Sequence, residues 1–579
     1  MKYRPWQKPV IERGIKALLD GRVYAINSPT GSGKTFMSLS IAFRMKLLAR
    51  AKRVIAVTRT RNQMLSYERD MRKFFPGRTY VALISKADAC PYAQKGADTE
   101  DINCELCSRR ANPDLARAQI MSHGIFKAID MMRDMREVCP YYSLRKLMER
   151  VDLVILTYPY LFSPITRKAV EGILPGAVVI VDEAHNLDNV GELFERRLSP
   201  QKIDYAIRQA KRLLQGTYIL RPLVAVLEKI KSRLVDILST GDPERQRYLP
   251  KDKLWELAAP QEIATIFDAA KMIRNIMSNI RQFGVNWVGS IAKFFESIDD
   301  EHLEAFYTTE EVVLKLVDPE PFLRILGKLD YVILQSGTLP PKEYMEKVWG
   351  ITKPIEYVDV DKEYGPVFPE ENKKFIVAED VNTRYNNRNG ELWDKYACYL
   401  EAIYRSAEAN VLAVAPSYKI VSELAKRLRH LPLIVEERKT RLDQVQEKIR
   451  GGGRHLILAV AQGKLSEGIE FTDPATGKSL LSDIVLVGIP YPMPDDYHKM
   501  RGQRIMARIT STTLTEFDIT MHIPAVITVK QALGRAIRSR EDKARFWLLD
   551  HRYLRRNWLE DLNILRYEKI TLSRVRCTH

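Results

Sequence analysis

The chain has 579 residues, of which 45% are hydrophobic and 28% are charged, so it is typical of a globular protein and too long for one hydrophobic core. Its net charge of +18 favours a polyanionic partner, although a generally basic surface would give the same balance. No stretch reaches the roughly 18 uncharged apolar residues of a membrane span, and charges interrupt residues 1–20, which argues against a signal peptide. We therefore expect three or four structural units in a cytoplasmic protein with no membrane contact.

Short apolar runs recur along the chain and are rich in Val, Ile and Leu, without alternation. They lie at residues 54–57, 153–156, 178–181, 332–334, 411–415, 456–460, 484–489 and 546–549. Strands buried on both faces have this composition, and helix-like segments separate them, which predicts an α/β fold with parallel sheets. Because ligands bind beyond the carboxyl ends of such strands, the polar residues at 58–60, 182–183, 336–338 and 416–418 are candidates for a site.

Two segments depart from this pattern. Residues 86–150 have little strand signal and contain four of the six cysteines. Residues 206–320 are predicted to be mostly helical, and the strand pattern resumes at Asp330. We interpret both segments as insertions into the first α/β unit.

A phosphate-binding loop is predicted after the strand-like run at residues 23–26. Small residues there allow successive backbone N–H groups to surround phosphate oxygens, together with the N-terminus of the following helix. Lys34 is expected to reach the β and γ phosphates of a nucleotide, and Thr35 to bind Mg²⁺. The loop consists of Ser28, Pro29, Thr30, Gly31, Ser32, Gly33, Lys34 and Thr35, with Ser28 where the general pattern has Gly.

Two further elements complete the predicted nucleotide site. Asp182 and Glu183 end the run at 178–181, where Asp182 is expected to bind Mg²⁺ and Glu183 to orient and deprotonate the attacking water. Arg535 and Arg538 lie three positions apart, which predicts one helix face with two guanidiniums for the charge of a transferring phosphoryl group. An ordinary basic helix face has the same spacing, and Gln531 just upstream favours the catalytic interpretation.

Four cysteines of the first insertion form a possible metal site: Cys90, Cys104, Cys107 and Cys139. Four thiolates from one segment can bind either Zn²⁺ or an iron–sulfur cluster. Zinc ribbons usually have two C-x-x-C pairs, whereas this segment has one pair and two single cysteines. Pro follows Cys90 and Cys139, as at the end of ferredoxin motifs, so the chemistry favours a [4Fe–4S] cluster while leaving Zn²⁺ open.

Together these motifs resemble superfamily 2 helicases of the DEAH type and, more narrowly, the XPD/DinG group of iron–sulfur DNA helicases, over essentially the whole chain. The resemblance implies two RecA-like parallel-sheet motor domains with ATP between them: residues 1–85, 151–205 and 321–345, then residues 346–579. It assigns residues 86–150 to a [4Fe–4S] cluster domain held by the four cysteines, and residues 206–320 to a helical Arch domain.

The resemblance also assigns individual residues. It implies an adenine-side role for Arg4 and Gln7, coupling of hydrolysis to movement for His185, and a nucleotide-site role for Glu470, where the family usually has Asp. Gln531, Arg535 and Arg538 belong to the second-domain motifs, and Arg59 and Tyr418 to the DNA-contact motifs. From side-chain chemistry alone, Tyr160 and Tyr385 are further candidates for stacking on DNA bases.

The function implied is 5′-to-3′ translocation on single-stranded DNA with unwinding of forked duplexes, driven by ATP and Mg²⁺, in nucleotide excision repair. We expect a monomer, and the compact length indicates an archaeal protein. Two alternatives stay open: a DinG-like helicase that resolves R-loops or other structures, and a zinc-structured nucleic-acid-binding protein in which ATP acts as a switch.

Overall fold

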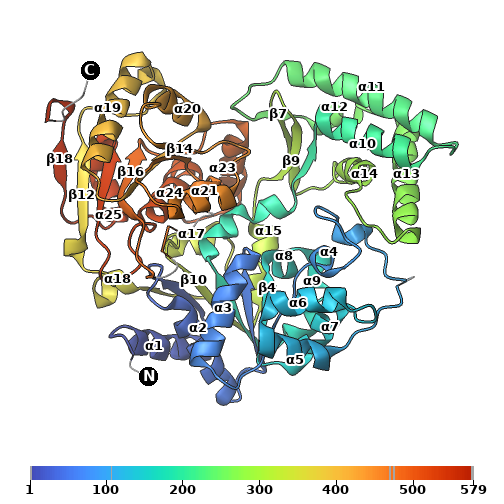
Figure 1. The fold of residues 1–579 in the computed structure, drawn as a ribbon, viewed down its shortest axis with the longest axis horizontal. Coiled ribbons are helices and arrows are strands. Elements are labelled where there is room, and N and C mark those ends of the chain that lie inside the picture. Colours follow the sequence, from blue (N-terminus) through green and yellow to red (C-terminus); the bar gives the residue numbers. More distant parts are fainter. Residues whose placement is uncertain (1–2, 106, 468–470, 474–475, 575–579) are drawn as a thin grey trace.

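The computed structural model describes residues 3–105, 107–467, 471–473 and 476–574. Glu470, a predicted nucleotide-site residue, lies outside them. Two seven-stranded sheets and one four-stranded sheet are present, each flanked by helices. Figure 1 shows the N-terminal part (blue) at the lower centre, the C-terminal part (orange to red) at the upper left, and green helices at the upper right.

The first sheet is parallel throughout and is built from runs that are buried on both faces. Its order is β11 (Ile355–Asp359), β1 (Val23–Asn27), β10 (Tyr331–Ser336), β5 (Ala177–Asp182), β2 (Arg53–Thr58), β4 (Leu153–Thr157) and β3 (Tyr80–Ala82). The helices α1 (Gln7–Leu19), α2 (Lys34–Leu47) and α3 (Arg61–Phe74) connect and cover these strands. Because β1, β10, β5 and β2 are neighbours, the predicted site loops that follow them meet at one edge.

The first motor domain extends further along the chain than predicted. We expected it to end at residue 345, but β11 pairs in parallel with β1, with Tyr24 opposite Glu356. β11 satisfies backbone groups that would otherwise be exposed at the edge of β1. Its sequence, IEYVD, lacks the continuous apolar run that identified the central strands, because an edge strand is only partly covered.

The second sheet is also parallel, and the RecA-like architecture of two motor domains is confirmed. Its order is β14 (Leu433–Val435), β15 (Leu456–Val460), β13 (Asn410–Ala415), β16 (Leu481–Val487), β17 (Ala544–Leu549), β12 (Lys373–Ala378) and β18 (Glu568–Ile570). Leu412 and Val414 of β13 pack into the main core, while Val411 and Ala413 pack into a second core. Burial on both faces explains why such strands are apolar at every position.

Helices cover both faces of the second sheet. α19 (Gly390–Ser406) and α20 (Tyr418–Arg427) bury the face that carries the second core. The remaining principal helices are α21 (Leu442–Arg450), α23 (Asp496–Arg508), α24 (Ile523–Leu533) and α25 (Arg556–Asp561).

The cysteine-containing insertion is mostly helical and packs against the first sheet. Its helices are α4 (Lys86–Ala89), α5 (Pro113–His123), α6 (Ile125–Asp134) and α7 (Pro140–Leu147). Ile120, Ile129 and Leu144 are buried in a core that is continuous with that of the sheet. Arg110 and Cys139 are joined by a backbone hydrogen bond of 2.8 Å, which brings the two halves of the insertion together.

The Arch contains the expected helices and a sheet that the sequence did not reveal. Its helices are α10 (Pro200–Leu213), α11 (Leu220–Ser239), α12 (Lys251–Trp255), α13 (Pro260–Asn279) and α14 (Trp287–Glu296). The sheet is antiparallel, in the order β6 (Arg196–Leu198), β9 (Val312–Leu316), β8 (Leu303–Tyr307) and β7 (Arg247–Leu249). The predicted boundary at residue 206 is therefore too late, since β6 already pairs with β9. A strand as short as β6 has too few residues to show a period.

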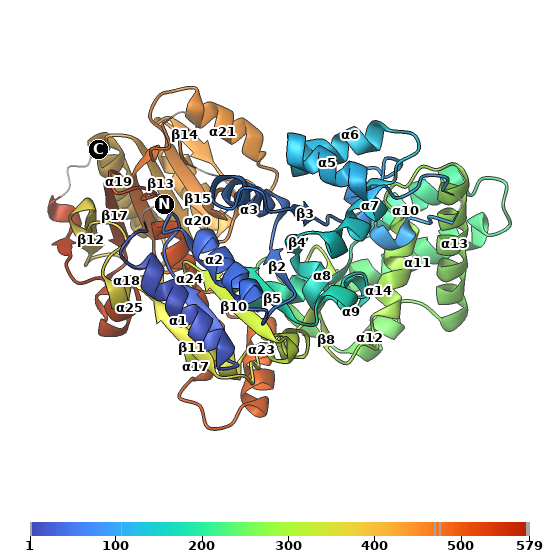
Figure 2. The ribbon, with the colours of Figure 1, turned by 90° about the horizontal axis from the view of Figure 1, so that it is seen from below.

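Helix α23 of the second motor domain forms ion pairs with both the first motor domain and the Arch. Arg501 pairs with Asp188 of the first motor domain at 2.8 Å, and Arg504 pairs with Glu304 of the Arch sheet at 2.9 Å. Because the two arginines are three residues apart, they share one face of the helix. In Figures 1 and 2, α5–α7 and the Arch helices lie on the side of the first sheet away from the second motor domain.

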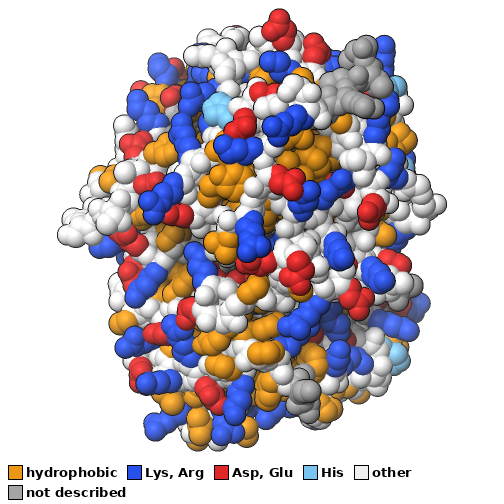
Figure 3. Space-filling view, turned by 90° about the vertical axis from the view of Figure 1, so that its left-hand side faces the viewer, with side chains coloured by type: hydrophobic (Ala, Val, Ile, Leu, Met, Phe, Trp, Pro, Cys, Tyr) orange, Lys and Arg blue, Asp and Glu red, His pale blue; other side chains and the backbone are white. Residues whose placement is uncertain are grey.

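The net positive charge is not gathered on the face shown in Figure 3, which is the left-hand side of Figure 1. Lys and Arg side chains alternate there with Asp and Glu. In the part of the chain that the structure describes, no helix is both long and apolar enough to cross a membrane.

Candidate nucleotide site and DNA interface

The phosphate-binding loop connects β1 to α2, as predicted from its sequence. Gly31 and Gly33 have φ angles of 88° and 94°, a conformation that favours glycine. Lys34 is buried and donates from Nζ to the carbonyl of Ser28 at 2.9 Å, so it spans the interior of the loop. Burial lowers the pKa of Lys34, an effect that the nearby carboxylates oppose.

The predicted adenine-side residues dock on this loop. Arg4 Nη1 donates to the carbonyl of Gly31 at 2.7 Å, and Gln7 Nε2 donates to the carbonyl of Ser32 at 3.3 Å. A Cβ at position 33 would lie 2.6 Å from Gln7 Nε2, so the close approach requires Gly33. Arg4 and Gln7 thus contact the phosphate-binding loop directly.

The second motor domain reaches the same loop from the other side. A Cβ on Gly31 would lie 2.7 Å from the carbonyl oxygen of Arg538, so the two backbones approach closely. The ring of Trp6 has the guanidiniums of Arg4 and Arg540 at 5.8 Å each. The loop is therefore enclosed by residues from both motor domains, which places the site between them.

The two carboxylates at the end of β5 have opposite pKa shifts. Burial, reinforced by the charge of Glu183, raises the pKa of Asp182, whose Oδ1 accepts from Gln335 Nε2 at 2.8 Å. Burial alone would also raise the pKa of Glu183, but the hydrogen bond from His185 and the charge of Lys34 lower it. Adjacent groups with opposed pKa values are typical of catalytic sites. Glu183 is held as a carboxylate, the form that can accept a proton from water.

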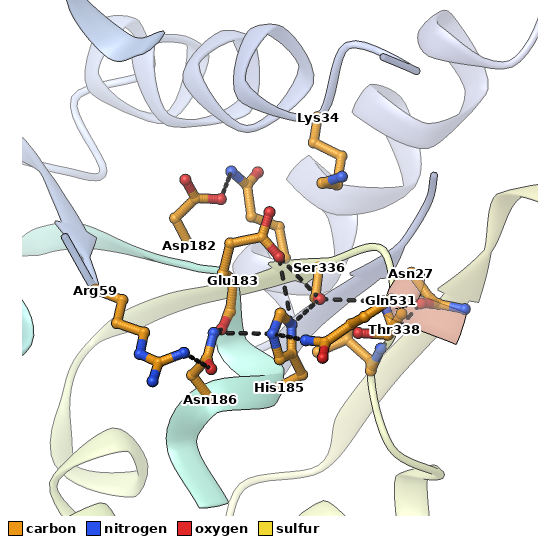
Figure 4. Close-up of polar contacts among 12 residues, drawn as sticks. Asn27, Lys34, Arg59, Asp182, Glu183, His185, Asn186, Ser336, Thr338 and Gln531 are labelled. Carbon is orange, nitrogen blue, oxygen red and sulfur yellow. Dashed lines mark hydrogen bonds and ion pairs between the residues drawn. The ribbon is translucent and has the colours of Figure 1, made fainter. Parts of the chain in front are cut away.

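A hydrogen-bond network joins Glu183 to the second motor domain (Figure 4). His185 Nδ1 lies 2.6 Å from Ser336 Oγ, which in turn lies 3.3 Å from Glu183 Oε2. On the other side of the ring, Nε2 contacts the side-chain amides of Gln531 and Asn186. Both amide contacts are made through NH₂ groups, an arrangement that fits the tautomer of His185 with an acceptor at Nε2 and the proton on Nδ1.

Asn186 is a functional candidate that the sequence reasoning missed. Its Nδ2 donates to the carbonyl of Glu183 at 3.1 Å and lies 2.8 Å from His185 Nε2. Its Oδ1 accepts from Arg59 Nη1 at 2.6 Å. The predicted DNA-contact residue Arg59 is therefore one side chain away from the catalytic motif. No sequence motif singles out an asparagine at this position. The only available signal was that Asn186 directly follows His185 in the turn after β5.

The prediction that Arg535 and Arg538 share one helix face is wrong. α24 ends at Leu533 and Gly534 is its C-cap, so both arginines follow the helix. Asp542 accepts a hydrogen bond from the N–H of Arg538 at 2.9 Å, which draws the chain out of the helical path. Arg538 still approaches the phosphate-binding loop, since its charge lowers the pKa of Lys34.

Three buried hydroxyl groups around the loop have no hydrogen-bond partner within the described residues: those of Ser28, Ser32 and Thr338. An unsatisfied buried hydroxyl is costly unless a ligand or water completes it. The donor set around the loop therefore fits a phosphorylated ligand and its ion. The remaining loop residues, Pro29, Thr30 and Thr35, are partly or fully exposed.

The four predicted cysteine ligands lie near one another in the insertion. The charges of Cys104 and Cys107 act on both Cys90 and Cys139, whose thiol pKa values burial raises. Backbone N–H groups directed at the sulfurs of Cys90 and Cys139 have the opposite effect and favour thiolates. Among the described residues, no three Cys, His, Asp or Glu side chains are close enough to hold one metal ion.

Two of the predicted DNA-stacking residues lie on the second motor domain with cations beside them. Tyr385 is 67% exposed, and the guanidiniums of Arg245 and Arg388 lie 5.4 Å and 5.7 Å from its ring. Tyr418 begins α20 and is half-buried, with the guanidinium of Arg438 6.0 Å from its ring. Exposed aromatic rings among arginines suit a single strand.

Tyr160 is placed differently and does not support the prediction made for it. Its ring is buried, and its hydroxyl donates to the carbonyl of Ile84 at 2.9 Å. The short helix α8 (Tyr158–Phe162) packs directly after β4, so its apolar residues are covered by the insertion and the sheet. Such a ring offers no face to a base, and we assign it to packing.

Family comparisons agree with the two motor domains. Residues 58–199 match the DEAD_2 family model, and residues 400–564 match the model of a helicase C-terminal domain. The first match covers strands of the first motor sheet together with the cysteine-containing insertion. The second covers most of the second motor sheet.

Similar proteins match over nearly the whole length. The ATP-dependent DNA helicase XPD of Sulfolobus acidocaldarius is 35% identical over 99% of this chain and 100% of that protein. This match is consistent with the expected archaeal origin. A solved XPD helicase has a TM-score of 0.85 at 33% identity, covering 99% of this chain and all 100% of that one. A solved apo XPD has a TM-score of 0.75 at 30% identity, with 97% and 100% covered. The chain therefore belongs to the XPD family of ATP-dependent DNA helicases.

Proposed function

We propose that this helicase hydrolyses ATP between its motor domains to move 5′ to 3′ along single-stranded DNA and to unwind forked duplexes. One observation carries the proposal. His185 contacts Gln531 of the second motor domain and, through Asn186, Arg59 on the predicted DNA side. A change at the γ phosphate can thus reach both the other motor domain and the strand. The polarity and a role in nucleotide excision repair rest on family membership.

Glu183 is the proposed general base. Its carboxylate accepts a proton from the attacking water, and the proton of His185 Nδ1 together with Ser336 Oγ holds that carboxylate in place. The low pKa of Glu183 keeps it ionised at neutral pH. We assign His185 a positioning role, since its ring contacts Glu183, the proposed base.

Phosphate binding is assigned to cations on both sides of the loop. Lys34 lies inside the loop, and Arg538 approaches from the second motor domain, so the two can stabilise charge on the phosphoryl group. Arg535 is proposed to contribute from the same segment. Thr35 and Asp182 would hold Mg²⁺, which neutralises phosphate charge when bound.

We propose a [4Fe–4S] cluster held by Cys90, Cys104, Cys107 and Cys139. Backbone N–H groups directed at Cys90 and Cys139, and the position of Cys139 at the N-terminus of α7, favour thiolates and oppose burial and the neighbouring thiols, which raise the pKa of both groups. A single Zn²⁺, bound by sulfurs at about 2.3 Å, is the alternative, and metal analysis separates the two. The cluster would supply a rigid cross-link between the two halves of the insertion.

We propose that the single-stranded DNA crosses both motor domains. Arg59 would contact it from the first, and Tyr385 and Tyr418 would stack on bases from the second. We expect the protein to act as a monomer, because one chain contains residues for each part of the nucleotide site.

ATP hydrolysis with and without single-stranded DNA tests the motor proposal. The protein should be purified without oxygen, its iron and sulfide measured, and its unwinding compared on forks with a 5′ or a 3′ overhang. We expect iron and sulfide, DNA-stimulated hydrolysis, and unwinding from the 5′ overhang. Hydrolysis that is indifferent to DNA would overturn the motor proposal, and zinc in place of iron would overturn the cluster.

The alternative of a DinG-like helicase is separated by substrate choice. Unwinding rates on forks, bubbles and RNA–DNA hybrids would be compared under one set of conditions. A clear preference for hybrids would favour the alternative.

A further inference from the structure

The turn that carries the proposed general base has an unusual backbone conformation. Glu183 has a φ angle of 47° and a ψ angle of 47°, in the left-handed region that residues other than glycine rarely adopt. Residues in such conformations cluster at functional sites and persist only where the surrounding contacts hold them. Because the backbone sets the direction of the side chain, the groups that hold this turn also decide where the Glu183 carboxylate points.

Tyr158 holds the turn from a strand that is not its neighbour. The Tyr158 hydroxyl lies 2.7 Å from the carbonyl oxygen of Asp182 and 3.0 Å from that of Glu183, so its one proton is shared between the two carbonyls. Tyr158 follows β4, whereas the turn follows β5, and β2 lies between these strands in the sheet. One side chain thus reaches along the edge of the sheet to two consecutive residues of the turn.

Tyr158 is itself fixed in place. The residue is 4% exposed, and its ring lies 5.4 Å from the ring of Phe162 in an edge-to-face arrangement. Helix α8, which begins with Tyr158, packs against β4, β2 and the helical segment Ala184–Leu193 that follows the turn. The buried hydroxyl is therefore a fixed point against which the turn is set.

The other contacts of Glu183 act on its carbonyl or on its carboxylate. The carbonyl accepts from the backbone N–H of Asn186 at 3.0 Å and from its Nδ2 at 3.1 Å. The carboxylate lies 3.3 Å from both Ser336 Oγ and His185 Nδ1, and Figure 4 shows the side chain directed toward these two groups. Tyr158 differs from these partners because it joins the carbonyls of both carboxylate residues.

We propose that Tyr158 is a positioning residue for ATP hydrolysis, whose hydroxyl fixes the backbone of Asp182 and Glu183 and thereby aims the Glu183 carboxylate at the attacking water. The inference rests on the proposed function, because it takes Glu183 as the base. A displaced base slows the chemical step even when the substrate still binds. Loss of the hydroxyl should therefore lower kcat for ATP hydrolysis and leave KM for ATP nearly unchanged.

Helix α8 also supplies a matched control, because a buried tyrosine hydroxyl can need a partner for packing alone. The hydroxyl of Tyr160, which is 5% exposed, donates to the carbonyl of Ile84 at 2.9 Å. Ile84 follows β3, which forms an edge of the sheet, and not the carboxylate turn. Tyr160→Phe thus removes the same group from the same short helix without touching the turn.

The test measures steady-state ATP hydrolysis by full-length wild type, Tyr158→Phe and Tyr160→Phe over a series of ATP concentrations, with and without single-stranded DNA. Phenylalanine keeps the ring and removes the hydroxyl. We expect Tyr158→Phe to lower kcat by about ten-fold, with KM for ATP within about two-fold of wild type. Tyr160→Phe should keep both constants within about two-fold of wild type.

A double-variant cycle separates positioning from packing. If Tyr158 acts through Glu183, Tyr158→Phe should change the residual kcat of Glu183→Gln by less than about two-fold, since the carboxylate that it aims is gone. A further loss of about ten-fold in that background would overturn the inference, because the hydroxyl would then act independently of Glu183. A wild-type kcat in Tyr158→Phe, an equal loss in Tyr160→Phe or a loss confined to KM would overturn it as well.

The same measurements keep the failure of this inference apart from that of the proposed function. If Glu183→Gln lowers kcat and Tyr158→Phe does not, this inference alone fails. If Glu183→Gln hydrolyses ATP at the wild-type rate, Glu183 is not the base, and that part of the proposed function fails with the inference.

Discussion

Two regions gather positive charge: the nucleotide site and a cavity between the cysteine-containing insertion and the Arch, here the junction cavity, which Lys95, Arg208 and Arg212 line. They differ in how that charge is paired. Lys34 is buried near Asp182 and Glu183, so its charge has partners of the other sign. Lys95 and Arg208 line an open cavity without a carboxylate among its described lining residues. The first arrangement fixes atoms for one reaction, whereas the cations of the second are exposed to solvent.

This difference predicts how the two regions respond to mutation. Loss of a buried, paired group in the nucleotide site should change the chemical step by orders of magnitude and depend little on salt. Loss of an exposed cation of the junction cavity should change the affinity for single-stranded DNA by small factors at most, and any change should depend strongly on salt.

The largest effect is expected for Lys34→Ala. Lys34 fills the phosphate-binding loop, so its loss should lower ATP hydrolysis by about 10³-fold and abolish unwinding. ATP hydrolysis would be measured as steady-state phosphate release, and unwinding on a forked duplex. Binding of single-stranded DNA without ATP should remain, and Lys8→Ala on the exposed face of α1 serves as the control. Retained hydrolysis would remove Lys34 from the site.

Glu183→Gln should separate chemistry from nucleotide binding. The amide keeps the shape of the carboxylate but cannot accept the proton, so hydrolysis should fall by about 10²-fold. The affinity for a fluorescent ATP analogue should stay within about three-fold of wild type, unlike that of Lys34→Ala. A parallel loss of affinity would show that Glu183 acts mainly on ground-state binding.

Cys139→Ser should affect the insertion and leave the motor working. Without the proposed cross-link the insertion cannot hold its shape at the junction, and unwinding should fall by about ten-fold or more. DNA-stimulated hydrolysis should keep about half of its wild-type rate, because the nucleotide site is built by other residues. Iron content and visible absorption would confirm cluster loss, and normal unwinding by a cluster-free variant would contradict the role.

The smallest effect is expected where the strand and the nucleotide site meet. Arg59→Ala and Asn186→Ala should each reduce DNA stimulation of hydrolysis by about two- to ten-fold, since the two side chains share one hydrogen bond. The double variant should lose no more DNA stimulation than the more strongly affected of the two single variants. Additive losses would mean that the two residues act separately.

Much of the site was predictable because its motifs are local. Residues 28–35 and Asp182–Glu183 each lie on a short strand–loop segment, so the sequence that forms the backbone also carries the chemistry. The central strands were identified for a similar reason, since burial on both faces leaves an uninterrupted apolar run. Strands β11 and β6 were not predicted. β11 is only partly buried at the edge of its sheet, and β6 is too short, so neither has a continuous apolar run.

The order of the residues alone predicts a phosphate-binding loop, a carboxylate pair and a group of four cysteines, because each of these depends on neighbours along the chain. Their connections to one another follow from how the folded chain packs. Arg59 and Asn186 are 127 residues apart, and His185 and Gln531 are 346 apart, yet each pair is in contact. The same holds for the junction cavity, where like charges from two insertions meet. Such contacts depend on how the sheets and insertions pack, which no local pattern records.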